Sequence, residues 1–588
     1  MAVSARHRVE EKATNDAASK HCGCILSITV LVGLLSILVI TGQRLYVPNT
    51  SSSLFATTTK SNGVALPDLY EASIAELQAG LHAGHFTSVD LVKAYFARIE
   101  EVNLKGPMLR AVLELNPSAL EQAATLDRER KSEGARSPLH GIPILLKDNI
   151  ATHPSEGMNT TAGSFSLLGS IVPEDAGVVK RLRKAGAIIL GKGNMDEFAH
   201  FRGDNLPSGW SGRGGQNTNA YFPNGDPCGS SSGPGVATSI GLTTVSLGTE
   251  TDGSIVCPSS NNNIVGIKPT VGLTSRAGVI PISAHQDTVG PMARSITDAA
   301  IVLSVIAGKD NNDNYTLAQP SFIPDYMEAL NQNALRGKRI GVPRRAFCND
   351  TDIEESVNVA FNHALDIIRG LGATVVDPAD LPSADEIALS TNETTVTDVD
   401  FKIQINAWFD SLKTNPSGVR NLADLIKFND DHPELEKPPQ LEEQNMLIRS
   451  EATSGFDDAF YEALAFDEEL GKTRGIDATL TVHQLDALVL PSVRFTITSP
   501  AAIAGYPIVT VPLDFYPDNV AIGSAGPMTF YPAPGIPFGL SFFGTAFTEF
   551  DLIGFAFAFE QRTKARLKRK AFAAAIPKTQ LKDVMSQR

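Results

Sequence analysis

Residues 225–269 read GDPCGSSSGPGVATSIGLTTVSLGTETDGSIVCPSSNNNIVGIKP, and this stretch decides the fold. Two turns rich in glycine and serine, Gly229–Gly233 and Gly248–Ser254, flank the segment Val236–Leu247, which reads as a helix followed by a short buried strand. Glycine permits close backbone approach and positive φ, and successive unpaired N–H groups in such turns form a concave anion site. We therefore expect both turns to belong to one structural unit, with an oxyanion site beside the serine that ends the second.

A flexible linker is the common alternative for a cluster of glycine and serine. Apolar runs bracket the second turn here, Thr243–Leu247 before it and Ile264–Ile267 after it. The predicted helix ties the first turn to the same unit. The pattern therefore favours two turns that are fixed to a core.

A lysine ends another apolar run, because Lys147 follows Ile142–Leu146 in the segment Gly141–Asn149. Burial drives a lysine toward its neutral form, and a neutral amine can act as a general base. Its pKa must fall from about 10.4 to roughly 7, which costs on the order of 5 kcal/mol. A strand-end lysine that extends to water is the alternative for an isolated residue.

Lys147, Ser230 and Ser254 together resemble the Ser–cis-Ser–Lys triad of the amidase signature family. The sequence Gly-Thr-Glu-Thr-Asp-Gly-Ser at residues 248–254 most resembles the corresponding motif of the peptide amidase branch. The resemblance covers most of the chain. Its matching segments are Gly141–Asn149, Gly209–Ser211, Arg213–Gln216, Cys228–Gly233, Gly248–Pro258, Gly266–Thr270, Gln286–Arg294, Ala504–Pro512 and Gly535–Gly544.

The resemblance implies hydrolysis of a carboxamide C–N bond through an acyl-enzyme, releasing a carboxylic acid and ammonia or an amine. It makes Ser254 the nucleophile, Ser230 the bridging serine with a cis peptide bond, and Lys147 the base. Small amides or C-terminally amidated peptides are the implied substrates, with no cofactor and no metal. The oxyanion-hole amides implied by the family are those of Thr251, Asp252, Gly253 and Ser254.

Two residues depart from the commonest family wording. Asp252 stands where a glycine is usual, and Val256 stands where an arginine often follows the isoleucine after the nucleophile. Neither replaces a member of the triad. The oxyanion hole uses backbone N–H groups, which Asp252 retains, so these departures concern the substrate and the geometry of the hole.

Other readings stay open at this point. Gly229–Gly233 also matches the G-x-S-x-G nucleophile elbow of α/β-hydrolase esterases, with Ser231 as nucleophile. That elbow needs a strand directly before it, whereas Gly215–Pro227 reads as a loop. The histidine it requires would be one of His285, His363, His432 and His483. A non-catalytic membrane-anchored module and an amidotransferase component that hands ammonia to a partner are further alternatives.

The N-terminal region predicts a membrane protein. Residues 1–23 are polar and carry four basic side chains, and residues 24–42 are uncharged, about 28 Å long as a helix and able to span a bilayer core. The basic tail predicts a cytosolic segment 1–23, a single-pass signal anchor 24–42, and a catalytic domain in the lumen or outside the cell. Secretion after signal cleavage is the alternative, although no A-x-A-like site follows.

Small features agree with a secretory location. Sequons predict a glycoprotein; they lie at Asn49, Asn159, Asn314, Asn349 and Asn392. Cys22 and Cys24 are candidates for S-palmitoylation. Cys228, Cys257 and Cys348 are too few and too oddly spaced for a disulfide framework, so the first two are expected to be small buried residues. The net charge of −15 argues against a nucleic-acid partner.

The remaining chain predicts one large α/β domain, a mixed sheet covered by helices, over residues 67–580 after a stalk at 43–66. Capping-box patterns at Ser73, Thr87 and Ser118 mark helix starts. Residues 383–480 are more charged and predict a helical insertion, either a wall over the substrate cleft or a solvated face. The apolar runs expected as strands are Ile142–Leu146, Ala187–Leu190, Thr243–Leu247 and Ala487–Leu490.

Overall fold

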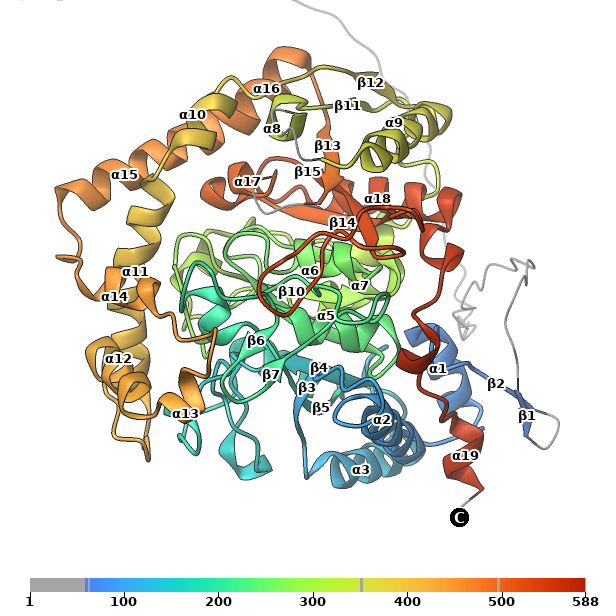
Figure 1. Ribbon diagram of the computed structural model, residues 1–588. Coiled ribbons are helices and arrows are strands. Elements are labelled where there is room, and N and C mark those ends of the chain that lie inside the picture. Colours follow the sequence, from blue (N-terminus) through green and yellow to red (C-terminus); the bar gives the residue numbers. More distant parts are fainter. Residues whose placement is uncertain (1–58, 62–63, 349–352, 494–496, 587–588) are drawn as a thin grey trace, which may run out of the picture. The chain divides into compact units, whose positions relative to one another are not determined.

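The computed structural model describes residues 59–61, 64–348, 353–493 and 497–586. Its centre is an 11-stranded mixed sheet in the order β12-β11-β13-β15-β14-β9-β10-β8-β4-β5-β3 (Figure 1). The predicted α/β fold with a mixed sheet covered by helices is therefore confirmed. The strands are β3 (Val112–Leu115), β4 (Pro143–Lys147), β5 (Ile188–Gly193), β8 (Val245–Glu250), β9 (Val265–Lys268), β10 (Thr288–Ala293), β11 (Arg339–Gly341), β12 (Thr374–Val376), β13 (Ala487–Ser492), β14 (Ile508–Phe515) and β15 (Pro537–Phe543).

Three neighbouring parallel strands set the position of the site. β4 pairs in parallel with β5 on one side and with β8 on the other, where Leu146 lies opposite Leu247. Every residue of β4 is buried, as the continuous apolar run predicts for a strand covered on both faces. Because carboxyl ends of parallel strands meet at one edge of a sheet, Lys147 ends beside the turn that follows β8.

Helices pack against this sheet, and two of the three predicted capping boxes form. Ser73 caps α1 (Ile74–His82) with Glu76, and Thr87 caps α2 (Ser88–Val102) with Asp90. Ser118 precedes α3 (Ala119–Ser132) as expected but makes no side-chain cap, so that prediction is wrong. The other main helices of the core are α4 (Gly177–Lys184), α5 (Ser232–Ser239), α6 (Val256–Asn261), α7 (Ile296–Ile306), α8 (Arg345–Cys348), α9 (Glu355–Gly370), α17 (Ser499–Ala504), α18 (Glu549–Thr563) and α19 (Leu581–Met585).

The stretch expected as an insertion contains a run of helices, drawn in yellow and orange in Figure 1. A buried charge cluster joins it to the core, because Arg202 Nη1 lies 2.5 Å from Glu197 Oε1 and 3.2 Å from Glu436 Oε2. All three side chains are fully buried, and burial and then the nearby Glu197 carboxyl raise the pKa of Glu436. Arg202 is the cation on which both carboxyl groups depend. The helices are α10 (Ala384–Leu389), α11 (Asn392–Ser411), α12 (Leu422–Asp431), α13 (Pro433–Glu436), α14 (Asn445–Glu451), α15 (Asp458–Glu468), a π-helical segment (Glu469–Ile476) and α16 (Asp477–His483).

The prediction of a single-pass membrane protein with a lumenal or extracellular catalytic domain is corrected. A span needs about 20 consecutive apolar residues in a helix, and among the residues that the structure describes no helix is long and apolar enough. The expected tail 1–23 and anchor 24–42 lie outside the described residues. The expected stalk 43–66 lies largely outside them, and its end forms two short antiparallel strands, β1 (Thr59–Ser61) and β2 (Val64–Leu66).

The side chain of Asn159, one of the predicted glycosylation sites, makes hydrogen bonds within the protein. Asn159 Nδ2 donates to Glu114 Oε1 at 3.0 Å, and Asn159 Oδ1 accepts from the Gly169 N–H at 2.9 Å. Its carboxamide is thus engaged at both ends. Asn49 and Asn349 lie outside the described residues, and the glycoprotein assignment has no support here.

Candidate active site

Lys147 ends β4 in direct contact with the first serine turn. Its Nζ donates to Ser230 Oγ at 2.7 Å and to the Thr249 carbonyl at 3.0 Å, and its side chain is fully buried. Burial lowers the pKa of Lys147 from 10.5 to about 7, because desolvation outweighs the attraction of three nearby carboxyl groups. The lysine therefore stands close to its neutral form at physiological pH, where it can accept a proton from a hydroxyl.

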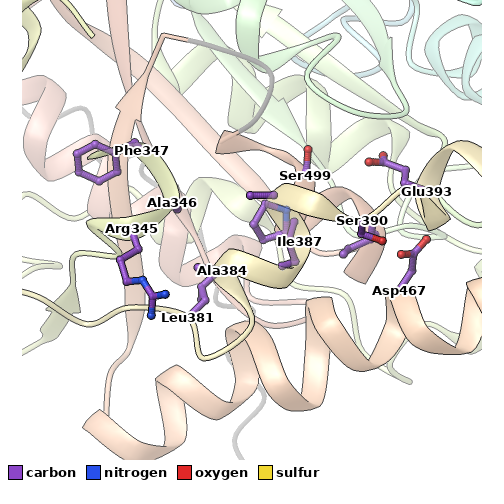
Figure 2. A pocket seen from close by; sticks show the side chains of 13 residues that line it. Arg345, Ala346, Phe347, Leu381, Ala384, Ile387, Ser390, Glu393, Asp467 and Ser499 are labelled. Carbon is purple, nitrogen blue, oxygen red and sulfur yellow. The ribbon is translucent and has the colours of Figure 1, made fainter. Parts of the chain in front are cut away.

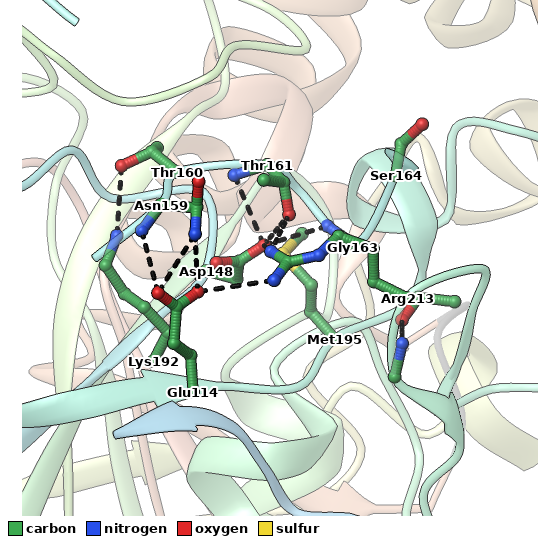
Figure 3. A network of polar contacts seen from close by, with 12 residues as sticks. Glu114, Asp148, Asn159, Thr160, Thr161, Gly163, Ser164, Lys192, Met195 and Arg213 are labelled. Atoms are coloured by element: carbon green, nitrogen blue, oxygen red, sulfur yellow. Dashed lines mark hydrogen bonds and ion pairs between the residues drawn. The ribbon is translucent and has the colours of Figure 1, made fainter. Parts of the chain in front are cut away.

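A buried polar network holds the end of β4 from behind (Figure 3). The Asp148 carboxylate, next to Lys147, accepts from the Thr161 hydroxyl and from the Gly163 N–H at 3.0 Å. Arg213 donates to the same Thr161 hydroxyl at 2.8 Å. These contacts fix the direction in which Lys147 leaves the strand.

A second buried lysine lies in this network but away from the serines. Lys192 Nζ donates to the Ile150 carbonyl at 2.6 Å and to Thr160 Oγ1 at 3.1 Å. Burial lowers its pKa to about 8. Its bonds go to the loop after β4 and not to a serine, so Lys147 is the lysine that the structure brings to the predicted site.

The first turn contains a non-proline cis peptide bond between Gly229 and Ser230. Ser230 is fully buried, and its carbonyl accepts from the Asp196 N–H at 3.2 Å. The next residue, Ser231, donates its N–H to the Ser254 carbonyl at 3.1 Å. The two serine turns, separated in the sequence by a helix and a strand, therefore meet through a backbone hydrogen bond, as expected.

A disulfide also joins the two turns, which corrects the expectation for their cysteines. Cys228 and Cys257 are bonded to each other, with their Cα atoms 5.8 Å apart. Cys228 lies just before the cis bond, and Cys257 lies in the first turn of α6, which begins after Ser254. A framework argument from spacing misses this bond because only the fold brings the two turns together.

Glu250 organises the turn that carries Ser254. One carboxylate oxygen accepts from the Gly253 N–H at 3.0 Å, and the other accepts from the N–H groups of Ile255 at 2.6 Å and Val256 at 2.8 Å. Gly253 has φ of 77°, which favours glycine. Ser254 is 6% exposed, so a small part of its surface stays accessible while its turn is held by Glu250.

The four amides expected in the oxyanion hole are therefore not equivalent. The Gly253 N–H is engaged by Glu250. Within the described ranges, the N–H groups of Thr251, Asp252 and Ser254 donate to no protein acceptor. Three donors thus remain in the turn beside the Ser254 hydroxyl.

Ser231 lacks the surroundings of a nucleophile elbow. Its hydroxyl donates to the Thr249 carbonyl at 3.1 Å and accepts from the Thr249 N–H at 3.2 Å. Ser231 is fully buried and follows a loop instead of a strand. His285, the first histidine named for that mechanism, pairs with Asp400 at 2.7 Å. The elbow alternative therefore has no support.

Comparison with known proteins identifies the family. The family model described as Amidase matches residues 90–553, so the chain belongs to the amidase family. The solved structure of a peptide amidase from Stenotrophomonas maltophilia is 44% identical, with a TM-score of 0.77, and the match covers 87% of this chain and 99% of that one. The resemblance to the amidase signature family and its peptide amidase branch is confirmed.

Relatives point to the same class. A protein of Arthroderma benhamiae is 43% identical over 544 residues, and the match covers 88% of this chain and 90% of the relative. That relative is named provisionally as an amidase. One chain of the glutamyl-tRNA(Gln) amidotransferase of Chloroflexus aurantiacus is 33% identical over 523 residues, covering 85% of this chain and 98% of the relative. The chain is thus an amidase-family hydrolase acting on carbon–nitrogen bonds.

Some contacts that shape the site were not found by sequence reasoning. The Thr249 carbonyl accepts from Lys147, and Glu250 holds the turn that contains Ser254. The Asp252 carboxylate accepts from Thr498 Oγ1 and from Ser499 Oγ at 2.8 Å. A charged residue at the end of a buried apolar strand, as Glu250 is, was the one signal in the sequence. The contacts of Asp252 come from a helix far along the chain and leave no local signal.

Proposed function

We propose that this chain hydrolyses the carboxamide of small amides, including C-terminally amidated peptides. Ser254 is the nucleophile, Ser230 the proton relay and Lys147 the base. The observation that carries the proposal is the fully buried Lys147, whose Nζ lies 2.7 Å from Ser230 Oγ and whose pKa is lowered to about 7. The likeness to a peptide amidase supports the amidated peptide as substrate class.

The proposed reaction has two halves. Lys147 accepts a proton through Ser230 as Ser254 Oγ attacks the amide carbon, and the new C–O bond gives a tetrahedral oxyanion. When the C–N bond breaks, Lys147 returns the proton through Ser230 to the leaving nitrogen, and ammonia or an amine departs. Water then attacks the acyl-enzyme ester by the same path, releasing the carboxylic acid and restoring Ser254.

The oxyanion would be stabilised by the backbone of the second turn. The N–H groups of Thr251, Asp252 and Ser254 are the donors left for it, because Glu250 already accepts from Gly253. Preorganised donors of this kind stabilise the charge that develops in the transition state, each contributing roughly 3–4 kcal/mol. In this proposal the Gly253 N–H stabilises the turn through Glu250 and does not bind the oxyanion.

Release of ammonia tests the proposal. The full-length chain would be incubated with an amidated peptide, a fatty acid amide and an aryl amide, each alone and without an acceptor. We expect ammonia from at least one of them and none above background from Ser254→Ala. Ammonia that appears only with an acceptor would favour an amidotransferase. Ester hydrolysis that disappears in Ser231→Ala, with no amide hydrolysis, would reject the triad.

A further inference from the structure

A cavity of about 390 Å³ lies between the core and the helices that follow residue 383 (Figure 2). Its two ends differ in charge. Arg345 and Phe347 lie at one end, and Glu393 and Asp467 lie next to each other at the other, with Ser499 close by. The apolar side chains between these ends include Leu381, Ala384 and Ile387.

Asp467 is the unusual member of this lining. It comes from α15 and is only 3% exposed, and its carboxyl group has no hydrogen bond or ion pair with any residue that the structure describes. Its neighbour Glu393, at the start of α11, accepts from Gln286 Nε2 at 2.7 Å and meets no cation within the same residues. Burial raises the pKa of each carboxyl to about 7. The buried Asp467 and the half-buried Glu393 thus face a cavity, and among the residues that the structure describes neither meets the positive charge that normally accompanies such groups.

The basic end of the cavity does not neutralise them. Arg345 is exposed and forms an ion pair with Asp385 of α10. Within the part of the chain that the structure describes, the acidic end is therefore left with its hydrogen bond from Gln286.

The acidic end lies against the turn that carries the nucleophile. Ser499, which lines the cavity, donates to Asp252 Oδ2 at 2.8 Å, and Asp252 stands two residues before Ser254. Burial and then the nearby Glu393 carboxyl raise the pKa of Asp252, so the two sites lie within electrostatic reach. Asp252 thus links the acidic end of the cavity to the turn of Ser254.

The chemistry of this end selects its occupant. Buried carboxylates bind most strongly to cations that also donate hydrogen bonds. Within the described part of the chain no three His, Cys, Asp or Glu side chains gather as metal ligands, which favours an organic cation. An ammonium or guanidinium would donate hydrogen bonds to both carboxyl groups.

We propose that this cavity is a subsite for a cationic group of the substrate, so that the enzyme prefers carboxamides whose acyl portion carries an ammonium or guanidinium. The proposal rests on the proposed function, because it assigns a substrate class to the same reaction. It makes Glu393 and Asp467 the residues that determine specificity.

Matched substrate pairs test it in the full-length chain. Nα-acetyl-lysinamide would be compared with Nα-acetyl-norleucinamide, which keeps most of the stem but lacks the ammonium. Alaninamide would be compared with Nα-acetyl-alaninamide, which lacks the charged α-amine. In at least one pair we expect the cationic member to have a kcat/KM about tenfold higher or more, as for a charge-assisted hydrogen bond.

Variants locate the preference. Asp467→Asn and Glu393→Gln should each bring the ratio of kcat/KM within the responding pair down several-fold. Asp385→Asn, which changes an exposed carboxylate at the far end of the cavity, should keep the wild-type ratio. The ratio is measured within each preparation, so partial loss of folded protein does not alter it.

Three outcomes are distinguishable. A cationic preference that falls in the two variants and persists in Asp385→Asn supports the subsite. Equal turnover of both members in both pairs, or a preference that survives Asp467→Asn and Glu393→Gln, overturns it while leaving amide hydrolysis intact. Absence of turnover for every amide counts against the proposed function itself, and therefore against the subsite that rests on it.

Discussion

Lys147→Met tests the buried base, because it removes the amine and keeps an unbranched apolar side chain. Burial lowers the pKa of Lys147 from 10.5 to about 7. At about 1.4 kcal/mol for each pKa unit, charging this lysine in the folded state costs about 5 kcal/mol relative to the unfolded chain. The same residue should therefore control both activity and a part of the pH dependence of stability.

The sign of the stability effect follows from proton binding. Between pH 7 and pH 10.5 the unfolded chain carries a proton on Lys147 that the folded chain largely lacks, so folding becomes more favourable as the pH rises through this window. Lys147→Met has no such group. Wild type should gain about 3 kcal/mol of stability over the variant between about pH 6 and about pH 9.5.

Two assays check this prediction. Urea unfolding of wild type and Lys147→Met at both pH values gives the stability gap. The profile of kcat/KM against pH gives the activity, which should rise through about pH 7 in wild type and be lost in the variant. Lys192→Met is the matched control, since Lys192 is also buried, with a pKa of about 8, but bonds to neither serine. Its profile should keep the rise near pH 7.

Near-wild-type activity in Lys147→Met would refute the assignment of the base. So would a stability gap that does not change with pH, because the lysine would then be charged in the fold. A rise near pH 7 that disappears in His285→Ala would instead assign the proton to the His285–Asp400 pair.

Other changes probe the rest of the site. Ser254→Ala should lower kcat by roughly 10³-fold or more. Ser230→Ala should lower kcat less, since water can replace a relay hydroxyl. Steady-state kinetics measures both losses, and equal losses would contradict a relay role for Ser230. Arg202→Met leaves two buried glutamates without their cation and should lower the free energy of unfolding in urea by about 3–5 kcal/mol. An unchanged urea midpoint would show that the cluster does not stabilise the contact between the helices after residue 383 and the core. Replacing Cys228 and Cys257 together by serine opens a link between residues 29 positions apart and should cost about 3–4 kcal/mol by the same assay, with a smaller loss pointing to residual structure in the unfolded chain.

The parts of the site that sequence reasoning found are those with a local signal. The run Ile142–Leu146 predicts a buried strand, and the lysine at its end follows from that strand. The segment Val236–Leu247 predicts the helix and strand that bring the two serine turns together, and α5 and β8 do so. The roles of Ser230 and Ser254 came from resemblance to the family. The sequence Gly229–Gly233 alone fits the G-x-S-x-G elbow equally well, with Ser231 as the nucleophile.

The parts that were missed depend on contacts between distant segments. Cys228 and Cys257 bond because their turns meet in space, and spacing alone does not show it. Glu393 and Asp467 stand more than 70 residues apart and converge only when α11 and α15 pack. The membrane location was wrong because it rested on the length and flanking charge of residues 24–42 alone, a segment outside the described residues.

Mapping the serine that forms the covalent intermediate tests the central claim most directly. The full-length enzyme would be labelled with a serine-directed fluorophosphonate and cleaved after Glu250, which separates Ser254 from Ser230 and Ser231, before mass spectrometry of the fragments. The proposed mechanism predicts the label on Ser254, with no label in Ser254→Ala. A label on Ser231, or one that remains in Ser254→Ala, would contradict it.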